Sequence, residues 1–252
     1  MVKLSDQPVA IVTGGGSGMG LATASELASD HHVVVVGRRK DVLEDAVSAI
    51  GEQASAFPAD LTDVDQVQAV ADHVVETFGR VDVLVNMAGV RPPMLYTDAD
   101  LREAVAVWHE QMALNATSQF MMAFAVARHL TRPGGRIVNV SSEAAVSGGS
   151  LPGMSTYAAA KGAVHGLTLS LARELSPVGI TVNCVVPGYV EATGLTADFG
   201  EAQREALAER IPVRRAGRVS DMASAVRYLV SEGAGFVTGQ FLHLNGGSTF
   251  GR

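Results

Sequence analysis

A tyrosine and a lysine four residues apart, Tyr157 and Lys161, are the side chains whose types and spacing most directly suggest chemistry. They lie in Ser155–Leu175, which is rich in alanine and leucine and ends before Pro177, so we predict a helix there. Residues four apart on a helix share one face, and a nearby ammonium lowers the pKa of a phenol. The pair could therefore carry out proton transfer. Taken alone, however, the spacing favours an ordinary amphipathic helix that happens to carry both residues.

A glycine-rich turn, TGGGSGMG at Thr13–Gly20, follows the first predicted strand and precedes a helical pattern. Such a turn lets backbone N–H groups approach a pyrophosphate, and the dipole of the following helix favours the negative charge. Because strand, turn and helix occur in this order, we predict a dinucleotide site rather than a bare structural turn. The candidate contacts are Gly14, Gly16, Ser17, Gly18, Met19 and Gly20.

The end of the second predicted strand carries Gly37, Arg38 and Arg39 instead of a carboxylate. An Asp or Glu at this place would accept hydrogen bonds from the ribose 2′-OH of NAD, whereas a guanidinium matches the 2′-phosphate of NADP. We therefore predict NADP(H) in preference to NAD(H). Arg38 is the principal contact and Arg39 the second, although Arg39 could also be a solvated charge at the start of a helix.

Short β-branched runs alternate with longer helical patterns along the chain, which predicts βαβ units and a parallel sheet. Strands are expected at about Val9–Thr13, His32–Gly37, Ala54–Phe57, Val81–Asn86, Gly135–Ser141, Thr181–Val186 and Gln240–Leu244. Helices are expected at about Gly18–Ser29, Asp41–Ile50, Asp63–Phe78, Asp98–Leu114, Ala116–Leu130, Ser155–Leu175 and Ser220–Ser231, with Asp63 and Asp98 as N-caps.

No linker, charge block or repeat divides the sequence. The predicted fold class is therefore α/β: one doubly wound domain over residues 1–252, with helices on both faces of a mostly parallel seven-stranded sheet. Two irregular segments, Glu143–Met154 and Gly188–Arg218, directly follow strands. Because ligands of such sheets bind outside the carboxyl ends of the strands, we expect substrate contacts in these two segments.

The composition limits the class of protein. Hydrophobic residues make up 47% and charged residues only 18%, which is typical of a compact globular chain. The net charge of −7 argues against nucleic-acid or anionic-membrane partners. Cys184 lies in an apolar run and is predicted to be a buried strand thiol, and the seven histidines show no metal-ligand spacing, so we predict no metal. The N-terminal sequence lacks a signal-peptide pattern, which leads us to expect a cytoplasmic protein.

Together, the glycine turn, the YAAAK motif at 157–161 and the alternating pattern resemble the short-chain dehydrogenase/reductase family over essentially the whole length. Its other landmarks occur in order: Asp60-Leu61, Asn86-Met-Ala-Gly89, Trp108 before Asn115, Ser142 after a strand, Asn183 to Gly188, and a closing VTGQ…NGG segment at 237–247. The closing segment and IPVRRAGR at 211–218 look most like the 3-oxoacyl-carrier-protein reductase group. The resemblance implies a Rossmann fold.

The resemblance also implies the roles of individual residues. Tyr157 would be the general acid in carbonyl reduction, with Lys161 lowering its pKa and binding the nicotinamide ribose. Ser142 would orient the carbonyl oxygen, and Asn115 would hold a water that links Lys161 to solvent. Further implied cofactor contacts are Asp60, Leu61, Asn86, Ala88, Gly89, Tyr157, Lys161, Pro187, Gly188, Val190 and Thr193.

Three places depart from the family pattern. Met87 stands where the family usually has asparagine. The stretch between Ser142 and Tyr157 is slightly longer than usual, which enlarges the predicted substrate loop and leaves Ser141 and Ser142 as alternatives for the catalytic serine. One additional residue also precedes Thr193, which places its cofactor contact differently from the family pattern.

The implied substrate is a 3-oxoacyl thioester, free or linked to an acidic acyl-carrier protein, or a related small ketone. For a carrier protein, Arg128, Arg132 and Arg173 could form a docking area, or they could simply cap helix ends. Two alternatives stay open: an NAD(H)-dependent dehydrogenase of a small alcohol, sugar or steroid, and a catalytically silent nucleotide-binding sensor. By resemblance we also expect a homotetramer.

Overall fold

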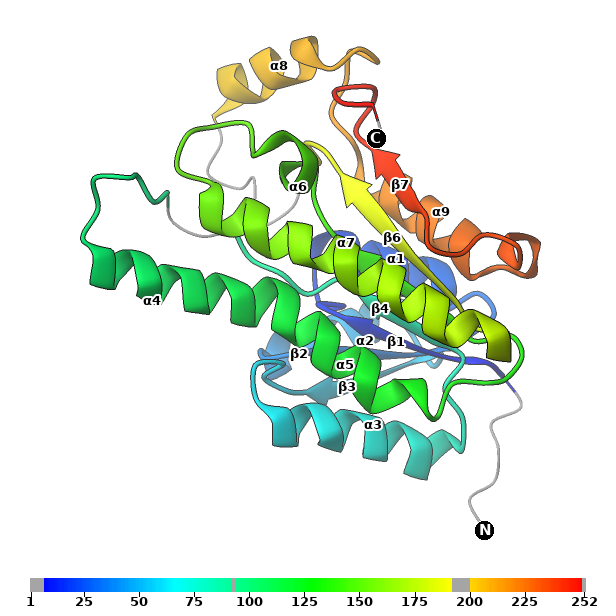
Figure 1. The fold of residues 1–252 in the computed structure, drawn as a ribbon. Helices are drawn as coiled ribbons and strands as arrows, with labels where there is room; N and C mark the ends of the chain where they lie inside the picture. The colour runs from blue at the N-terminus through cyan, green and yellow to red at the C-terminus, as the bar shows by residue number, and fades with distance from the viewer. Residues whose placement is uncertain (1–6, 92–93, 192–199, 251–252) are drawn as a thin grey trace.

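A seven-stranded parallel sheet forms the centre of the protein in the computed structural model, which describes residues 7–91, 94–191 and 200–250 (Figure 1). The strand order is β3-β2-β1-β4-β5-β6-β7, and every neighbouring pair is parallel. The strands are β1 (Val9–Thr13), β2 (His32–Gly37), β3 (Ala54–Pro58), β4 (Val83–Asn86), β5 (Arg136–Val140), β6 (Thr181–Pro187) and β7 (Phe241–Leu244). The predicted doubly wound fold class is confirmed.

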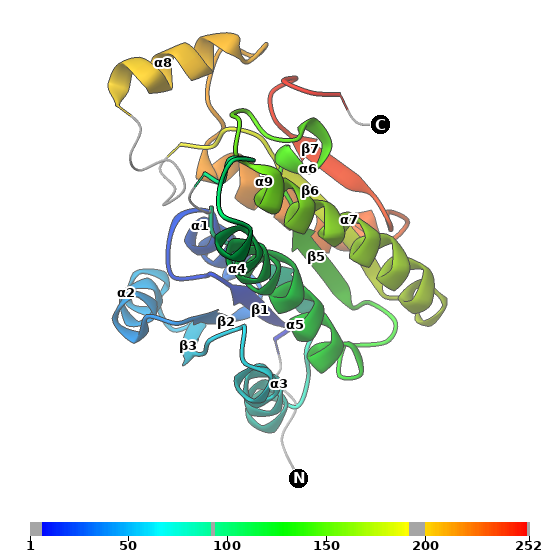
Figure 2. The same ribbon diagram turned by 60° about the vertical axis from the view of Figure 1, so that its left-hand side comes forward.

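Helices cover both faces of this sheet (Figure 2). The first face carries α1 (Gly18–Leu27), α2 (Lys40–Ile50) and α9 (Val219–Val230), whose apolar residues pack with Ala10, Val12 and Val35 of the strands. The second face carries α3 (Val64–Phe78), α5 (Ser118–Ala127) and α7 (Ser155–Leu175), which pack with Ile11, Val34 and Leu84. The remaining helices are α4 (Leu101–Met112), α6 (Ala144–Ser147) and α8 (Glu201–Arg210), with short 3₁₀ turns at Ser176–Val178 and Glu232–Ala234. Successive residues of each strand point to opposite faces of the sheet, so the strands contribute side chains to two separate hydrophobic cores.

The helices predicted at Asp98–Leu114 and Ala116–Leu130 form one continuous helical segment in the structure. Between α4 and α5 lies a single π-helical segment, Ala113–Thr117, so that the helix continues through Asn115 where the sequence predicted a break. The predicted N-cap at Asp98 is wrong: the side chain of Asp100 accepts hydrogen bonds from the backbone N–H groups of Arg102 and Glu103. The predicted cap at Asp63 is confirmed, since its carboxylate accepts from the N–H groups of Asp65 and Gln66. The short helix α6 was not predicted.

The chain reverses its direction of winding between β1 and β4, because β1 is paired with β2 on one side and β4 on the other. At such a switch point the loops that leave the strand ends diverge and open a crevice. The register pairs Thr13 with Asn86 and Val140 with Val185, so the segments that follow β1, β4, β5 and β6 emerge at one edge. Over the described residues, no helix is both long enough and apolar enough to cross a bilayer.

Candidate functional site

The turn after β1 is shaped by close backbone contacts. Gly14 has φ +68°, and a Cβ atom there would lie 3.0 Å from the Cα atom of Ala88. A Cβ atom on Gly20 would lie only 2.0 Å from the carbonyl oxygen of Gly14, so the first turn of α1 rests directly against the loop. Glycine is required at both positions for these steric reasons.

The N-terminus of α1 is left open by the protein's own side chains. Ser17 is the N-cap, but its hydroxyl makes no capping hydrogen bond, and no acidic residue stands in the first turn. This differs from α3 and α4, whose first N–H groups are bonded by Asp63 and Asp100. The N–H groups at the start of α1 are therefore suited to a bound anion, as a pyrophosphate requires.

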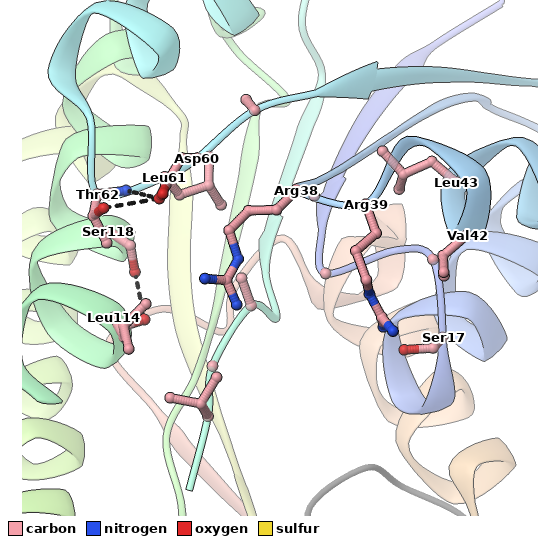
Figure 3. Close-up of a pocket in the computed structure, with 17 residues that line it drawn as sticks. Ser17, Arg38, Arg39, Val42, Leu43, Asp60, Leu61, Thr62, Leu114 and Ser118 are labelled. Atoms are coloured by element: carbon pink, nitrogen blue, oxygen red, sulfur yellow. Dashed lines mark hydrogen bonds between the residues drawn. The ribbon is translucent and has the colours of Figure 1, made fainter. Parts of the chain in front are cut away.

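A pocket extends from this turn to the ends of β2 and β3 (Figure 3). Figure 3 shows the side chain of Arg38 directed into it and that of Arg39 reaching toward Ser17. The Asp60 carboxylate is held by the N–H and hydroxyl groups of Thr62, which lower its pKa, and the charge of Arg38 lowers it further. Of the predicted cofactor residues, those that line this pocket are Gly14, Gly16, Ser17, Arg38, Arg39, Asp60, Leu61, Ala88 and Gly89.

A second pocket continues the first at Gly89 and contains three of the four predicted catalytic residues. Ser142, Tyr157 and Lys161 all line it, and so do the predicted cofactor contacts Met19, Pro187, Gly188 and Val190. Ser142 follows β5, whereas the other two residues lie one turn apart on α7. The helix and the strand tip therefore bring the serine to the tyrosine-lysine pair.

The hydroxyl of Tyr157 is almost fully buried, with 7% of the residue exposed. Burial raises its pKa, while a hydrogen bond with Ser142 and the positive charge of Arg91 oppose that rise. The predicted lowering of the tyrosine pKa by Lys161 is therefore not found in the structure: desolvation of the phenolate outweighs the favourable charges.

Lys161 is also buried, and its Nζ atom donates a hydrogen bond to the carbonyl oxygen of Val140 at 3.0 Å. Burial lowers its pKa to about 8, with a small opposing contribution from Cys184. The cause is the cost of placing an ammonium group away from water. The amine can therefore take up and release a proton close to neutral pH.

The geometry distinguishes the two serines at the end of β5. The hydroxyl of Ser141 donates to the carbonyl oxygen of Lys161 at 2.8 Å and is buried. The hydroxyl of Ser142 lies between the second pocket and a third one and bonds with Tyr157. Ser141 thus anchors helix α7 to the strand; both serines line the second pocket, but only Ser142 of the two also lines the third.

Asn115 lies behind Lys161 and is fully buried. Its amide group donates to the carbonyl oxygen of Val90 and to Gln111, and its Oδ1 atom accepts from the N–H group of Val90 at 3.0 Å. A Cβ atom on Gly89 would lie 2.8 Å from this Oδ1 atom and 3.1 Å from Nζ of Lys161. The two side chains thus face each other across Gly89, although Asn115 lines neither pocket.

The prediction that Asn86 contacts the cofactor is not supported by its position. Its side chain points into the core, where Nδ2 donates to Oδ1 of Asn139 at 3.0 Å and to the carbonyl oxygen of Gln119. Side chains alternate along a strand, and Asn86 falls on the same face as Leu84, toward α5. The hydroxyl of Thr13 instead holds the next two residues by accepting from the N–H groups of Met87 and Ala88.

Among the described residues, two other predicted cofactor contacts do not line these pockets. Gly18, with φ +53°, and Gly20 shape the start of α1 instead. Thr193 lies outside the described residues.

A third pocket of about 430 Å³ adjoins Ser142 and Tyr157, a volume in the range of small-molecule sites. Its walls come from the two irregular segments after β5 and β6, and from α8. Apolar wall residues are Leu151, Met154, Leu207 and Ile211, and charged ones are Arg91, Glu143 and Arg210. Arg91 lies outside the two segments in which substrate contacts were predicted, whereas Glu143 is the one charged residue of the predicted segment Glu143–Met154.

The three arginines considered for docking a carrier protein do not line any of these three pockets. Arg132 donates to the carbonyl oxygen of Ala127 at the end of α5, and Arg128 bonds with Gln68. Arg173 lies in the last turn of α7. Since helices in βαβ units run back from the strand tips, these residues belong to the opposite edge of the sheet.

Cys184 is a buried thiol on β6, as predicted, and burial raises its pKa to about 12. Within the described part of the chain, no group of three or more His, Cys, Asp or Glu side chains is arranged to hold a metal ion.

Comparison with known proteins places this geometry in a family. Residues 14–249 match a family model described as enoyl-(acyl carrier protein) reductase. The chain is 37% identical to nodulation protein G of Rhizobium sp. (strain N33), over 94% of this chain and 95% of that protein. It is 34% identical to the 3-oxoacyl-[acyl-carrier-protein] reductase FabG of Haemophilus influenzae, over 95% and 97%.

Two further relatives extend this set. The short-chain reductase protein NovJ of Streptomyces niveus is 38% identical, over 98% of this chain and 95% of that protein. The crystal structure of a dehydrogenase/reductase from Sinorhizobium meliloti 1021 superposes with a TM-score of 0.88 at 34% identity, covering 98% of this chain and 97% of that one. The chain therefore belongs to the short-chain dehydrogenase/reductase family, whose members are NAD(P)-dependent oxidoreductases acting on CH–OH and C=O groups.

Proposed function

We propose that this protein reduces a carbonyl group to a secondary alcohol with NADPH, and that Tyr157 is its general acid. The observation that carries the proposal is that Ser142, Tyr157 and Lys161 line one pocket, which continues into the pocket beside the open N-terminus of α1. When bound, the cofactor supplies a hydride to the carbonyl carbon. Ketone, NADPH and one proton thus give the secondary alcohol and NADP⁺.

Ser142 and Tyr157 have different roles at the carbonyl oxygen of the substrate. Ser142 donates a hydrogen bond to that oxygen and fixes its position, as an oxyanion-hole donor does. Tyr157 donates the proton, for which a protonated phenol is needed, and burial keeps the phenol protonated by raising its pKa.

Lys161 and Asn115 return a proton to Tyr157 after it has protonated the substrate. With its pKa of about 8, the lysine can return a proton to the tyrosinate at neutral pH. The space between Nζ and Oδ1 of Asn115 lies beside Gly89, where no side chain intervenes. A water bound there would link the lysine to solvent.

NADP(H) is the proposed cofactor rather than NAD(H). Arg38 is directed into the pocket at the end of β2, where the adenosine ribose of a dinucleotide lies in this fold. A guanidinium binds a 2′-phosphate by charge-assisted hydrogen bonds. The other proposed contacts are the lining residues given above, with Arg39 near Ser17 at the pyrophosphate end.

The proposed substrate is a 3-oxoacyl thioester or a related small ketone. The relatives named 3-oxoacyl-[acyl-carrier-protein] reductase support the thioester, and the apolar wall of the third pocket suits an acyl chain. Turnover of an acetoacetyl thioester compared with small free ketones, followed by loss of NADPH absorbance, separates the two substrates.

The substitution Tyr157→Phe tests the mechanism. It removes the acidic proton and leaves the ring packing, so kcat should fall by roughly 10²–10⁴-fold while the Kd for NADPH stays nearly unchanged. Steady-state kinetics and a fluorescence titration of NADPH measure the two quantities. A variant that retains more than about a tenth of the wild-type kcat would contradict the assignment.

A silent nucleotide sensor remains the alternative from another class. It would bind NADPH tightly and turn over no member of a broad carbonyl panel. The grouping of Ser142, Tyr157 and Lys161 argues against it, because a sensor has no use for a proton donor beside a ligand pocket.

We further propose that the protein is a homotetramer. Phe120 and Phe124 on α5 and Leu169 on α7 expose 43%, 54% and 49% of their surface, and the two phenyl rings lie in contact, with centroids 4.3 Å apart. A hollow lined by Phe120, Ala163 and Leu167 adjoins them. An exposed apolar patch on two neighbouring helices is suited to a second copy of the chain.

A further inference from the structure

Glu143 occupies a fixed place beside the catalytic serine. Its backbone N–H group donates to the carbonyl oxygen of Pro187 at 2.8 Å, which ties the residue after Ser142 to the last residue of β6. The proposed reaction gives Glu143 no role. Its side chain nevertheless lines the third pocket together with Ser142 and Tyr157.

The carboxyl group lies against the backbone of Gly188. A Cβ atom on Gly188 would lie 3.0 Å from Oε2 of Glu143 and 2.8 Å from Cβ of Asn245. Any side chain at position 188 would therefore crowd the carboxyl group. Glycine at this position keeps the space beside the carboxyl group clear.

The protein supports this carboxyl group from the side of β7. Nδ2 of Asn245 donates to Oγ1 of Thr249 at 2.8 Å, which leaves the Thr249 proton for a hydrogen bond to Glu143. Burial raises the pKa of Glu143, and the Thr249 bond and the nearby His243 oppose the rise. A carboxylate has about four acceptor positions, and the threonine uses one of them.

The other residues of the third pocket make the carboxyl group of Glu143 an unusual hydrogen-bond acceptor. Among the described residues that line the third pocket, Glu143 is the single acidic one, and Leu151, Met154 and Ile211 give the pocket an apolar wall. A partly buried carboxyl group gains most from a ligand that donates to it. An acyl chain without a donor would leave its remaining acceptor positions unpaired.

We propose that Glu143 determines substrate specificity by accepting a hydrogen bond from a hydroxyl or ammonium group on the carbon next to the reacting carbonyl. Ser142 and Glu143 are consecutive residues, so the acceptor lies beside the place that Ser142 gives the carbonyl oxygen. The inference rests on the proposed function and deepens it: of the two proposed substrates it favours the small ketone over the 3-oxoacyl thioester, and it narrows that ketone to the α-hydroxy or α-amino class.

Three ketones of equal size test the inference: hydroxyacetone, aminoacetone and butanone, which carry a hydroxyl, an ammonium or a methyl group at the same place. For the wild-type enzyme with NADPH, kcat/KM should be at least about tenfold higher for one or both donor ketones than for butanone. A preference for hydroxyacetone identifies a neutral donor, and a preference for aminoacetone identifies a cationic one.

Two substitutions of Glu143 and one control substitution test whether its carboxyl group causes the preference for donor ketones over butanone. Glu143→Leu should abolish the preference by removing both oxygens. Glu143→Gln keeps one acceptor oxygen without the charge, so it should retain part of a hydroxyl preference and lose an ammonium preference. Glu174→Gln, an exposed position on α7, should behave as wild type. If Glu143→Leu does not fold, the comparison of Glu143→Gln with Glu174→Gln decides.

Binding separates this inference from the proposed function. The same three ketones are titrated into the Tyr157→Phe protein loaded with NADPH, with nucleotide fluorescence as the signal. Tighter binding of a donor ketone, lost in the double variant with Glu143→Gln, supports Glu143 even if no ketone is turned over. Equal binding and equal kcat/KM for all three ketones would overturn the inference, whereas the proposed reductase activity would stand on the turnover of butanone.

Discussion

Arg38 illustrates how a single residue can set the choice of cofactor. It is directed into the pocket at the end of β2, and no carboxylate stands at that strand tip. A guanidinium can donate two charge-assisted hydrogen bonds to a 2′-phosphate, whereas a 2′-hydroxyl offers it only a neutral acceptor and finds on it no acceptor for its own proton. The preference for NADPH should therefore depend on this side chain more than on any other.

The substitution Arg38→Asp should reverse the preference. Loss of the charged hydrogen bonds, together with repulsion between aspartate and phosphate, should lower kcat/KM for NADPH by about 10–150-fold. The value for NADH should change little or rise, because the new carboxylate can accept from the ribose. Kinetics with both cofactors measure this, and Arg39→Ser serves as the control with a smaller effect. A wild-type enzyme that uses NADH as well as NADPH would contradict the assignment.

Lys161 should destabilise the folded protein at neutral pH. Its pKa falls from 10.5 to about 8 in the folded state, so between these two values the unfolded chain binds more protons. Stability contributed by this group therefore rises with pH across that window, and its cost is largest below pH 8. Lys161→Met should raise Tm at pH 7, by a margin that shrinks as the pH approaches 10. A margin independent of pH would show that the lysine is not held in a desolvated site.

For single residues, the sequence predicted which side chains gather at the candidate site better than it predicted the environment of each side chain. The choice of Ser142, Tyr157 and Lys161 as candidates followed from the family landmarks and their order along the chain, and all three line one pocket in the structure. The direction of the tyrosine pKa did not, because it depends on desolvation by residues distant in sequence. The direction of the Asn86 side chain was not predictable for a related reason, since the face on which a strand residue lies depends on which sheet neighbours cover it.

Among the elements, the start of α1 shows how closely a helix must approach its strand to present its N–H groups. The contact between Gly20 and the carbonyl oxygen of Gly14 fixes that approach. Any side-chain carbon at position 20 must push the helix outward. The helix start and the pyrophosphate contacts should therefore be lost together.

The substitution Gly20→Ala should lower the free energy of unfolding by about 1–3 kcal/mol and weaken NADPH binding. Chemical denaturation and a fluorescence titration measure the two effects. The matched control is Gly233→Ala in the exposed 3₁₀ turn Glu232–Ala234, where a Cβ atom would meet only Oγ of Ser231, at 3.6 Å. That change should stabilise the protein by up to about 1 kcal/mol. Similar behaviour of the two variants would exclude the steric explanation.

The sequence did not predict the continuous helical segment formed by α4, the π-helical turn and α5. Asparagine in a helical pattern suggested a break, because its side chain competes for backbone hydrogen bonds. In the structure the amide of Asn115 is fully occupied by Val90 and Gln111, and the helix continues past it. A tertiary partner thus removed the competition that the local sequence indicated.

For the whole molecule, the apolar patch on α5 and α7 leads to a prediction about assembly. Light scattering coupled to size exclusion should give the mass of a tetramer for the wild type. Phe124→Asp should give a smaller species, because it places a charge in a buried interface. Val64→Asp, at an equally exposed position at the start of α3, should leave the mass unchanged. A monomeric wild type would contradict the proposed assembly.

The sequence by itself determined the order of strands and helices and the glycine-rich turn after β1, and it indicated the candidate catalytic residues. These follow from periodicity and spacing, which are local properties of a chain. Only the tertiary structure decided which groups meet at the carboxyl edge of the sheet: that the Ser141 hydroxyl bonds to α7 while Ser142 lines two pockets, that the Asn86 side chain turns into the core, and that the carboxyl group of Glu143 lies against Gly188. The physical reason is that such contacts join strands far apart in sequence, and their geometry is set by strand order, register and the packing of helices on each face.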